Sequence, residues 1–241
     1  MKASDGTTPR PARGAACGAA LALVVLGAMM VAPRRARAQD AAPASNDRWQ
    51  ASLGLRGALF RDAGLDPFSA NDAFVQTSMA VSAALRTGTG LVPALGLALD
   101  LGNADDTARG VDSHLGLSRI AVLLEPRWVP RSDLYLAGRL APGLLRASTT
   151  LRDPSAPVLL RASYTSLSLD ASLGAGMRLN SASAPVGLWI LAEGGYGWAP
   201  RHRIALTPAL PQSDASKAGE VLLGTFAARG PFLRIGLALS Y

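Results

Sequence analysis

From residue 49 onward, apolar residues alternate with small or polar residues in one segment after another. In the clearest segment, residues 165–179, one set of alternate positions holds mainly Leu and Ala, and the other holds Ser, Gly, Asp and Arg. Successive side chains of a β-strand point to opposite faces, whereas a helix would distribute the same residues around its circumference. The alternation predicts an all-β chain of eight strands, at residues 49–60, 73–87, 91–102, 113–127, 133–146, 163–180, 186–203 and 222–241.

The expected connections are alternately long and short. The long links are residues 61–72, 103–112, 147–162 and 204–221, and short turns fall near residues 87–90, 128–132 and 181–184. An even number of antiparallel strands, with long links at one end and tight turns at the other, is typical of a transmembrane β-barrel. Each strand exceeds the ~9–11 residues that cross a bilayer at a tilt. The sequence thus predicts a closed, antiparallel, up-and-down transmembrane barrel.

Two of the expected strands contain irregularities. The alternation changes phase near Arg119, which indicates either a β-bulge or a misjudged register there. Pro142 has no N–H to donate to a neighbouring strand, so we expect it near a strand end.

The apolar face of such a barrel points either outward to lipid or inward around a ligand. Here the second face is mainly Gly, Ala and Ser with few charges, whereas a sheet face exposed to water usually carries more charge. We therefore expect Leu167, Leu169 and Leu173 to face lipid. The alternative is a soluble periplasmic, lipocalin-like barrel in which these side chains line a cavity for an apolar ligand.

Aromatic residues gather at both ends of the expected strands. Trp49, Trp128 and Tyr241 fall at the short-turn end. Those near the long-link end are Phe60, Phe74, Tyr164, Tyr196 and Trp198. Because aromatic rings favour the two membrane interfaces, this placement predicts two aromatic girdles.

The first 38 residues have the pattern of a secretory signal peptide. An uncharged run, residues 15–32, follows three basic residues and precedes Ala36-Arg37-Ala38, a small-x-small cleavage site before Gln39. The alternative is an uncleaved anchor helix, since the run approaches ~18 residues. We expect cleavage, a short periplasmic segment at 39–48 and a barrel domain at 49–241.

Charge and cysteine content exclude several classes of function. Residues 1–38 hold six of the 24 basic residues and one of the 17 acidic residues, so the remainder carries a net charge of only +2. This does not support nucleic-acid binding, which needs a basic patch. The single Cys excludes a disulfide scaffold and a cysteine-ligated metal site. We expect no cofactor and no metal.

The C-terminal residues lead to a family resemblance. Apolar residues at every second position end in an aromatic carboxy-terminal residue: Leu233, Ile235, Leu237, Leu239 and Tyr241. This ending resembles the assembly signal of bacterial outer-membrane β-barrel proteins. The chain from about Trp49 resembles the small eight-stranded class that includes the OmpA transmembrane domain, OmpX and OmpW. The resemblance implies the outer membrane of a Gram-negative bacterium, strand termini in the periplasm, long loops outside the cell and recognition of the last strand by the barrel-assembly machinery.

Charged residues on the second face are expected inside the barrel. An unpaired buried charge is costly, so they should form an ion-pair network. Its expected members are Arg56, Arg86, Asp100, Arg139, Asp170, Arg178, Glu193 and Arg234. Because many other inward positions are Gly, Ala or Ser, a narrow, weakly anion-favouring pore is a subsidiary hypothesis.

Few residues are candidates for chemistry. A nucleophilic enzyme needs a general base beside a nucleophile, and the two histidines are His114, near Ser113 and Ser118, and His202, between two arginines. Neither matches a known catalytic motif. A lipid-modifying enzyme therefore remains a weaker alternative, and no catalytic residue is assigned.

Two clusters of charge fall in the expected links. Acidic and amide residues could donate oxygens to calcium, but their spacing does not match an EF-hand, and a solvated loop is favoured: Asp100, Asn103, Asp105, Asp106 and Asp112. Arg201 and Arg203 would lie at the outer rim, where they could contact lipopolysaccharide phosphates. The sequence as a whole predicts a monomeric, non-enzymatic outer-membrane barrel with a structural or surface-exposed role, in contact with membrane lipid and lipopolysaccharide.

Overall fold

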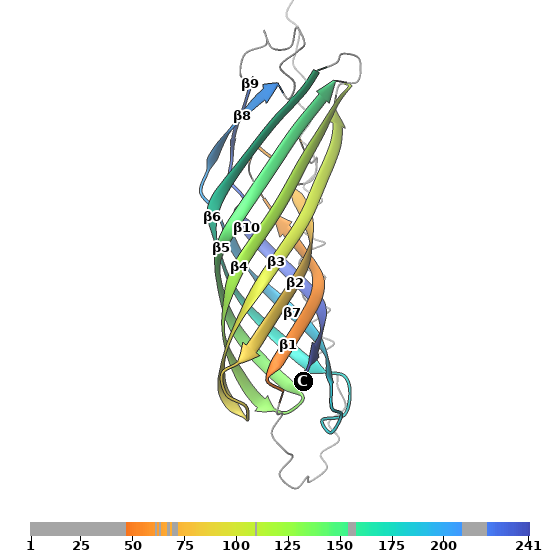
Figure 1. The fold of residues 1–241 in the computed structure, drawn as a ribbon, viewed down its shortest axis with the longest axis vertical. Coiled ribbons are helices and arrows are strands. Elements are labelled where there is room, and N and C mark those ends of the chain that lie inside the picture. Colours follow the sequence, from red (N-terminus) through yellow and green to blue (C-terminus); the bar gives the residue numbers. More distant parts are fainter. Residues whose placement is uncertain are drawn as a thin grey trace, which may run out of the picture. The chain divides into compact units, whose positions relative to one another are not determined.

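The computed structural model describes residues 47–60, 62, 64–66, 68, 72–108, 110–153, 158–208 and 221–241. The expected signal peptide, its cleavage site at Ala36 and Ala38, and residues 39–46 lie outside the described residues. The described part contains no helix long and apolar enough to cross a membrane. Its strands (Figure 1) are β1 (Trp49–Leu59), β2 (Ala73–Ala84), β3 (Gly90–Ala108), β4 (Val111–Arg131), β5 (Leu134–Asp153), β6 (Val158–Arg178), β7 (Gly187–Trp198), β8 (His202–Pro208), β9 (Val221–Phe226) and β10 (Gly230–Ser240).

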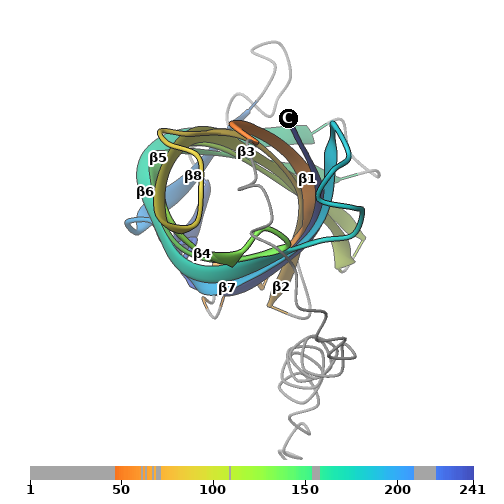
Figure 2. The same ribbon diagram turned by 90° about the horizontal axis from the view of Figure 1, so that it is seen from below.

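Eight of these strands close into a barrel. Their order is β5-β4-β3-β2-β1-β10-β7-β6, and pairing of β5 with β6 completes the ring. Every pairing is antiparallel, and the first and last strands are joined from Gln50–Ser240 to Ala58–Phe232. The closed ring is visible along the barrel axis (Figure 2). The predicted fold, an eight-stranded antiparallel barrel, is confirmed.

The two ends of the barrel differ. We call the end that holds Trp49 and Tyr241 the terminal end, where Tyr241 N donates to the Trp49 carbonyl at 3.1 Å. The opposite end, with the β3–β4 and β5–β6 connections, is the far end. There β8 and β9 form a hairpin in the connection from β7 to β10, and β8 pairs with β6 through Arg161–Thr207. The predicted strands 186–203 and 222–241 are therefore each divided in two.

Two predicted long links are mostly strand. Residues 103–112 contain the ends of β3 and β4, which stay paired up to Ala108–Val111. This pair leaves two residues in the connection, and Gly110 adopts the left-handed φ of 79° that so tight a turn requires. In the link predicted at 147–162, β5 continues to Asp153 and β6 begins at Val158. The prediction of long loops at these two places was wrong.

The predicted irregularities also lie elsewhere. The β3–β4 register is continuous through Arg119, and the β4 register against β5 shifts between Trp128 and Arg131 instead. Pro142 lies in the middle of β5 rather than near its end, opposite Leu169 of β6. On the other side, the β4–β5 pairing passes from Ala121–Gly143 to Leu124–Leu140, as expected where proline has no N–H to donate.

The apparent phase change in β4 has a different cause. The same alternate residues point inward along the whole strand, but the chemistry of both faces inverts. Toward the terminal end the outward residues are apolar, including Ile120 and Val122, and toward the far end they are polar, including Ser118 and His114. The apolar residues therefore move from one set of alternate positions to the other, while the backbone register against β3 continues unchanged.

The neighbouring strands invert at matching positions. Outward residues change from apolar to polar between Leu101 and Asn103 on β3, and between Leu144 and Arg146 on β5. On β6 the change falls between Leu167 and Thr165. Leu144 pairs with Leu167, and Arg146 pairs with Thr165. This boundary separates a region suited to lipid from one suited to water.

The outward apolar side chains form one belt, which we call the apolar band. Leu167 and Leu173 are 70% and 75% exposed, which confirms the predicted outward orientation of these side chains. Other exposed members include Leu53, Leu55, Val81, Leu97, Ile120, Leu140, Leu144, Leu188, Leu237 and Leu239. Trp49, Trp128, Tyr196, Trp198 and Tyr241 are also exposed, as the girdle prediction requires.

Beyond the band, the barrel interior is apolar. A cluster that we call the far-end core includes Phe60, Phe74, Leu115, Leu117, Leu145, Ile204, Phe226 and Phe232. Phe60 and Phe74 were expected in the aromatic girdle but are buried in this core, with ring centroids 6.0 Å apart. Tyr164 packs against the same core. The far-end strands therefore form a water-exposed extension with its own hydrophobic interior.

The apolar band predicts that a charged substitution destabilises the barrel more within the band than beyond it. Leu173→Arg, at mid-band on β6, should destabilise the folded barrel by about 2–4 kcal/mol, because arginine is costly at the bilayer midplane. Thr165→Arg, on the same face of the same strand but beyond the boundary, should change the free energy of unfolding by less than about 1 kcal/mol. Guanidinium unfolding of vesicle-reconstituted protein measures both values. Equal effects would contradict the placement of the boundary.

Candidate functional site

The lumen contains an extended network of ion pairs centred on Asp100 of β3. This carboxylate is completely buried. It lies 3.0 Å from Arg119 Nη1, 3.1 Å from Arg234 Nη2 and 3.4 Å from Arg56 Nη1. Ser78 Oγ of β2 donates to it at 2.6 Å. Three guanidinium groups from β1, β4 and β10 thus converge on one carboxylate.

A second carboxylate, Asp170 of β6, faces two of the same arginines. Its Oδ2 is 3.1 Å from Arg56 Nη2 and 3.0 Å from Arg119 Nη1. Arg119 also donates to Ser168 at 3.1 Å and to the carbonyl of Ala141, next to the proline. Arg56 and Arg119 therefore link Asp100 of β3 with Asp170 of β6 across the lumen.

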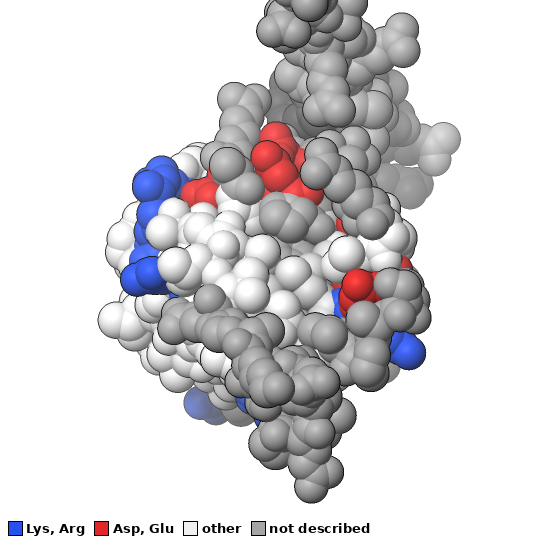
Figure 3. Space-filling model, turned by 90° about the horizontal axis from the view of Figure 1, so that it is seen from above, with Lys and Arg blue, Asp and Glu red and all other residues white. Residues whose placement is uncertain are grey.

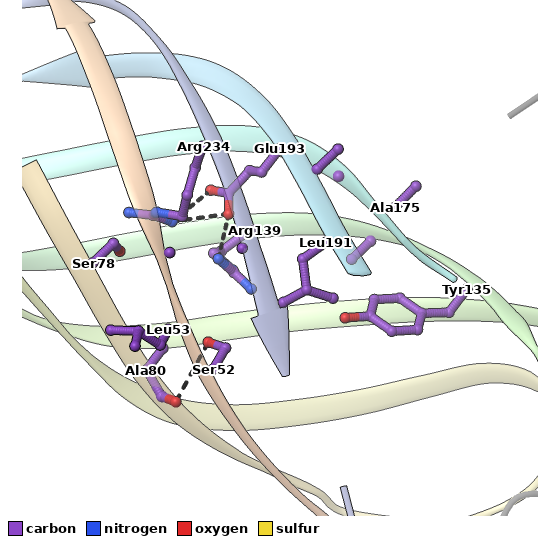
Figure 4. Close-up of a pocket in the computed structure, with 15 residues that line it drawn as sticks. Ser52, Leu53, Ser78, Ala80, Tyr135, Arg139, Ala175, Leu191, Glu193 and Arg234 are labelled. Atoms are coloured by element: carbon purple, nitrogen blue, oxygen red, sulfur yellow. Dashed lines mark hydrogen bonds and ion pairs between the residues drawn. The ribbon is translucent and has the colours of Figure 1, made fainter. Parts of the chain in front are cut away.

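The network continues toward the terminal end (Figure 4). Arg234 Nη1 is 2.8 Å from Glu193 Oε2, and Glu193 also pairs with Arg139. Arg139 Nε donates to Glu125 at 2.8 Å. Glu125 accepts in turn from Arg127 Nε at 2.6 Å. We call the complete chain of groups the ion ladder: Arg56, Asp100, Arg119, Glu125, Arg127, Arg139, Asp170, Glu193 and Arg234.

The ion ladder connects the whole circumference. Seven of the eight barrel strands contribute a charged group, and β2 contributes hydrogen bonds from or to Gln76, Ser78 and Ser82. A buried pair is weak evidence of stability, because desolvation offsets the attraction. Loss of one partner is costly, however, since it leaves a charge buried and unpaired. The ladder therefore favours the one strand register in which all the charges are paired.

Six of the eight predicted network residues belong to the ladder: Arg56, Asp100, Arg139, Asp170, Glu193 and Arg234. Arg178 points inward at the terminal end, where it pairs with Asp47 at 3.4 Å. Arg86 is not in the lumen: it is exposed in the β2–β3 turn and donates to the Leu91 carbonyl. A position so close to the end of β2 lies beyond the barrel wall.

The prediction omitted Arg119, Glu125 and Arg127, all from β4. The apparent phase change hid them, because the apolar residues of β4 occupy different faces in its two halves. The sequence did contain a pattern that could have identified them, because the positions of these three residues differ by six and by two, both even numbers. Such spacing places them on one face of a strand.

Side chains fill most of the remaining lumen. A cavity of about 30 Å³ lies beside the ladder, lined by residues that include Ser52, Tyr135 and Glu193 (Figure 4). A second, of about 50 Å³, lies at the terminal end beside Trp189. These volumes suffice for a few water molecules. At the other end the far-end core occupies the interior.

The two histidines lie at the far end, outside the ladder. His114 points outward from β4, and its Nδ1 is 2.5 Å from Asp105 Oδ1 of β3. Ser118 shares its face, whereas Ser113 is buried on the other. His202 of β8 stacks on Tyr164, with ring centroids 4.6 Å apart.

The acidic residues do not gather at one place. Asp100 is in the lumen, whereas Asp105 and Asp112 are exposed on the β3–β4 hairpin, where Asp112 accepts from Thr107 at 2.9 Å. Among the residues that the structure describes, no group of three or more histidine or acidic side chains could hold a metal ion.

Charged side chains also mark the far-end surface (Figure 3). Arg201 lies 3.7 Å from Asp62, and both Arg201 and Arg203 are exposed. Lipopolysaccharide contact by these two arginines stays a prediction.

Comparison with known proteins yields likeness in structure only. No protein-family model and no curated protein matches the chain. The outer membrane protease OmpT from Escherichia coli is 9% identical, with a TM-score of 0.47 over 84% of this chain and 99% of that chain. A major outer membrane protein from Thermus thermophilus is 14% identical, with a TM-score of 0.47 over 80% and 99%. Neisserial surface protein A is 17% identical, with a TM-score of 0.41 over 83% and 100%. At these values no activity is transferred to this chain.

The ladder predicts a strong effect from one buried carboxylate. Asp100→Asn should lower the free energy of unfolding by about 3–5 kcal/mol, because it leaves three buried guanidinium groups short of a partner. Asp112→Asn, the same change on the exposed hairpin, should stay within about 0.5 kcal/mol of the wild type. Guanidinium unfolding in vesicles gives both values.

A double variant tests whether the ladder acts as a unit. Asp100→Asn combined with Arg119→Gln should cost less than the two single changes together, since contacting charges couple. Additive losses would show that the two groups act independently.

Proposed function

We propose that the chain is an outer-membrane barrel with a structural, surface-exposed role, whose lumen neither conducts nor catalyses. The observation that carries this proposal is the filled lumen. An ion ladder occupies the middle of the barrel, and an apolar core occupies its far end. All five ladder arginines are paired with carboxylates, which leaves no arrangement suited to proton transfer or nucleophilic attack.

Location in the outer membrane is supported by three features. The barrel is closed, as lipid requires, because no water is present to satisfy an open strand edge. Its outward face carries the apolar band. The sequence adds a secretory signal and a final strand that resembles the assembly signal of such barrels. On this proposal the terminal end faces the periplasm and the far end faces outward from the cell.

The soluble, ligand-binding alternative has less support. It requires the apolar side chains of residues 165–179 to line a cavity, but these side chains point outward. The inward positions of the same strand are Ser, Asp, Gly and Arg. They favour a polar, filled interior over an apolar ligand site.

Expression with its own signal in a Gram-negative host tests the location. We expect the protein in the outer-membrane pellet, with unboiled and boiled samples migrating differently, because a closed barrel resists detergent until heated. Tyr241→Ser should lower the amount of protein that shows this heat-dependent shift if the assembly machinery recognises the last strand. A soluble periplasmic band without a shift would reject the proposal.

Planar-bilayer recording tests the closed lumen. The purified protein should give no conductance steps above the bare bilayer, while a general porin inserted under the same conditions gives steps. Small steps with an anion preference would instead support the narrow-pore hypothesis, since the ladder has one more arginine than carboxylate.

A further inference from the structure

The pairing of β1 with β10, which we call the seam, differs from the other pairings of the barrel. Every other pair of neighbouring barrel strands is joined by a turn or, for β7 and β10, by the connection that contains the β8–β9 hairpin. The two strands of the seam come from opposite ends of the barrel sequence. No short connection keeps them close once their hydrogen bonds break. The seam is therefore the place where a closed barrel would open first.

The terminal half of the seam has few contacts on its inner face. The ion ladder crosses the seam near its other half, where Arg56 of β1 and Arg234 of β10 both bind Asp100. From there toward the terminal end, the next inward residues on the two strands are small: Ser52, Gly54, Gly236 and Ala238. Three of these four residues line the cavity of about 30 Å³ beside the ladder. Side-chain packing thus does little to hold this half of the seam closed.

A cluster of polar side chains joins the two sides of the seam beyond this cavity. Ser240 Oγ, at the end of β10, donates to Asp47 Oδ2 at 2.5 Å. Trp189 Nε1 of β7 donates to Ser240 Oγ at 2.7 Å. Arg178 Nη1 of β6 donates to the same Asp47 oxygen at 3.4 Å. We call these four residues the terminal clasp. Because Asp47 lies two residues before β1, the clasp connects the start of the first strand with the last strand.

The surroundings hold the members of the clasp in place. Ser240, Trp189 and Arg178 are buried, so a donor or acceptor left without its partner here is costly. Arg178 Nε also donates to Asn180 at 3.1 Å. The Trp189 ring packs against Tyr135 of β5, with ring centroids 5.4 Å apart. Both donors are therefore positioned by contacts outside the clasp.

A glycine leaves the space in which three of these groups meet. Gly187 of β7 is the register partner of Ser240. A Cβ on Gly187 would collide with Ser240 Oγ and would lie 2.7 Å from Trp189 Nε1 and 2.8 Å from Asp47 Oδ2. Any side chain at position 187 would therefore push the three groups apart.

We propose that the terminal clasp is a lock on the seam. While Asp47 is bound, the seam stays closed, and release of Asp47 lets β1 and β10 separate from the terminal end while the other strands remain paired. The first backbone bonds to break are those from Arg48 N and Trp49 N to the Tyr241 carbonyl, of 2.9 and 3.0 Å. Local opening of this kind occurs in cooperative units that are smaller than the whole fold.

The ladder sets the limit of the opening. Separation stops where Arg56 and Arg234 are held by Asp100, because breaking these contacts leaves buried charges unpaired. An open seam exposes two strand edges that lipid cannot satisfy. The clasp therefore determines how long the barrel stays closed, which is a property beyond the structural role proposed above.

Hydrogen–deuterium exchange tests the lock. The full-length protein, expressed with its own signal, is purified and reconstituted in phospholipid vesicles, and exchange is followed by mass spectrometry. Asp47→Ala should speed exchange at residues 50–54 and 236–240 by about 10-fold or more, because it removes a charged partner from two hydrogen bonds. Residues 120–124 of β4 should keep the wild-type rate. A general loss of stability would instead raise exchange in β4 as well.

Two further variants complete the exchange experiment. Ser240→Ala removes the hydroxyl between Trp189 and Asp47, and it should also speed exchange at the seam alone. Asp133→Ala is the matched control, because Asp133 is an exposed carboxylate 3.2 Å from Arg131 in the β4–β5 turn, away from the seam. It should leave exchange at the seam unchanged. Each variant is compared only if it keeps the heat-dependent gel shift of the wild type.

A cross-link across the seam should replace the clasp. Ala51 and Leu239 are register partners on β1 and β10, and Ile120 and Leu144 are register partners on β4 and β5. The single native Cys, Cys17, lies in the expected signal peptide. In the Asp47→Ala background, a disulfide between cysteines at positions 51 and 239 should restore slow exchange at the seam. A disulfide between cysteines at positions 120 and 144 should not.

Three results would overturn the proposal. One is seam exchange at the wild-type rate in both Asp47→Ala and Ser240→Ala. Another is an equal rise in exchange at the seam and in β4, which would make the clasp an ordinary contribution to overall stability. The third is equal rescue by the two disulfides. Because all three concern the opening of the folded barrel in vesicles, they are independent of where the protein resides in the cell.

Discussion

Every backbone N–H and C=O in a lipid-exposed strand must find its partner on another strand, because hydrocarbon offers none. In this chain the requirement is met by the β1–β10 and β5–β6 pairings, which turn eight strands into a ring without an edge. Closure fixes two separate surfaces. One faces lipid and carries the apolar band, and the other faces a narrow interior that side chains must fill.

The interior is filled in two chemically different ways. At the depth of the apolar band, the lumen is polar and its charged groups pair with one another in the ion ladder, from Asp170 to Arg127. Beyond the band, where the outer face meets water, the interior becomes apolar and includes Leu117 and Phe232. The same strands thus serve as a membrane barrel over one part of their length and as a soluble hydrophobic fold over the rest.

The number of barrel strands and the residues that share a face were determined by the sequence alone, because period-two alternation is local: Leu167, Leu169 and Leu173 must share a face in any β-strand. The ends of the strands could not be predicted from the sequence. Residues 103–112 resemble a loop in composition, and most of them are strand only because β3 and β4 continue to pair. The ladder was only partly predictable for a similar reason. Arg119, Glu125 and Arg127 could be assigned to the lumen only once the interior and exterior of β4 were known to exchange character at the membrane boundary. Which ladder groups meet was beyond prediction, because strand register and barrel closure bring together residues as far apart as Asp100 and Arg234, 134 positions from one another, and register is a property of the assembled sheet.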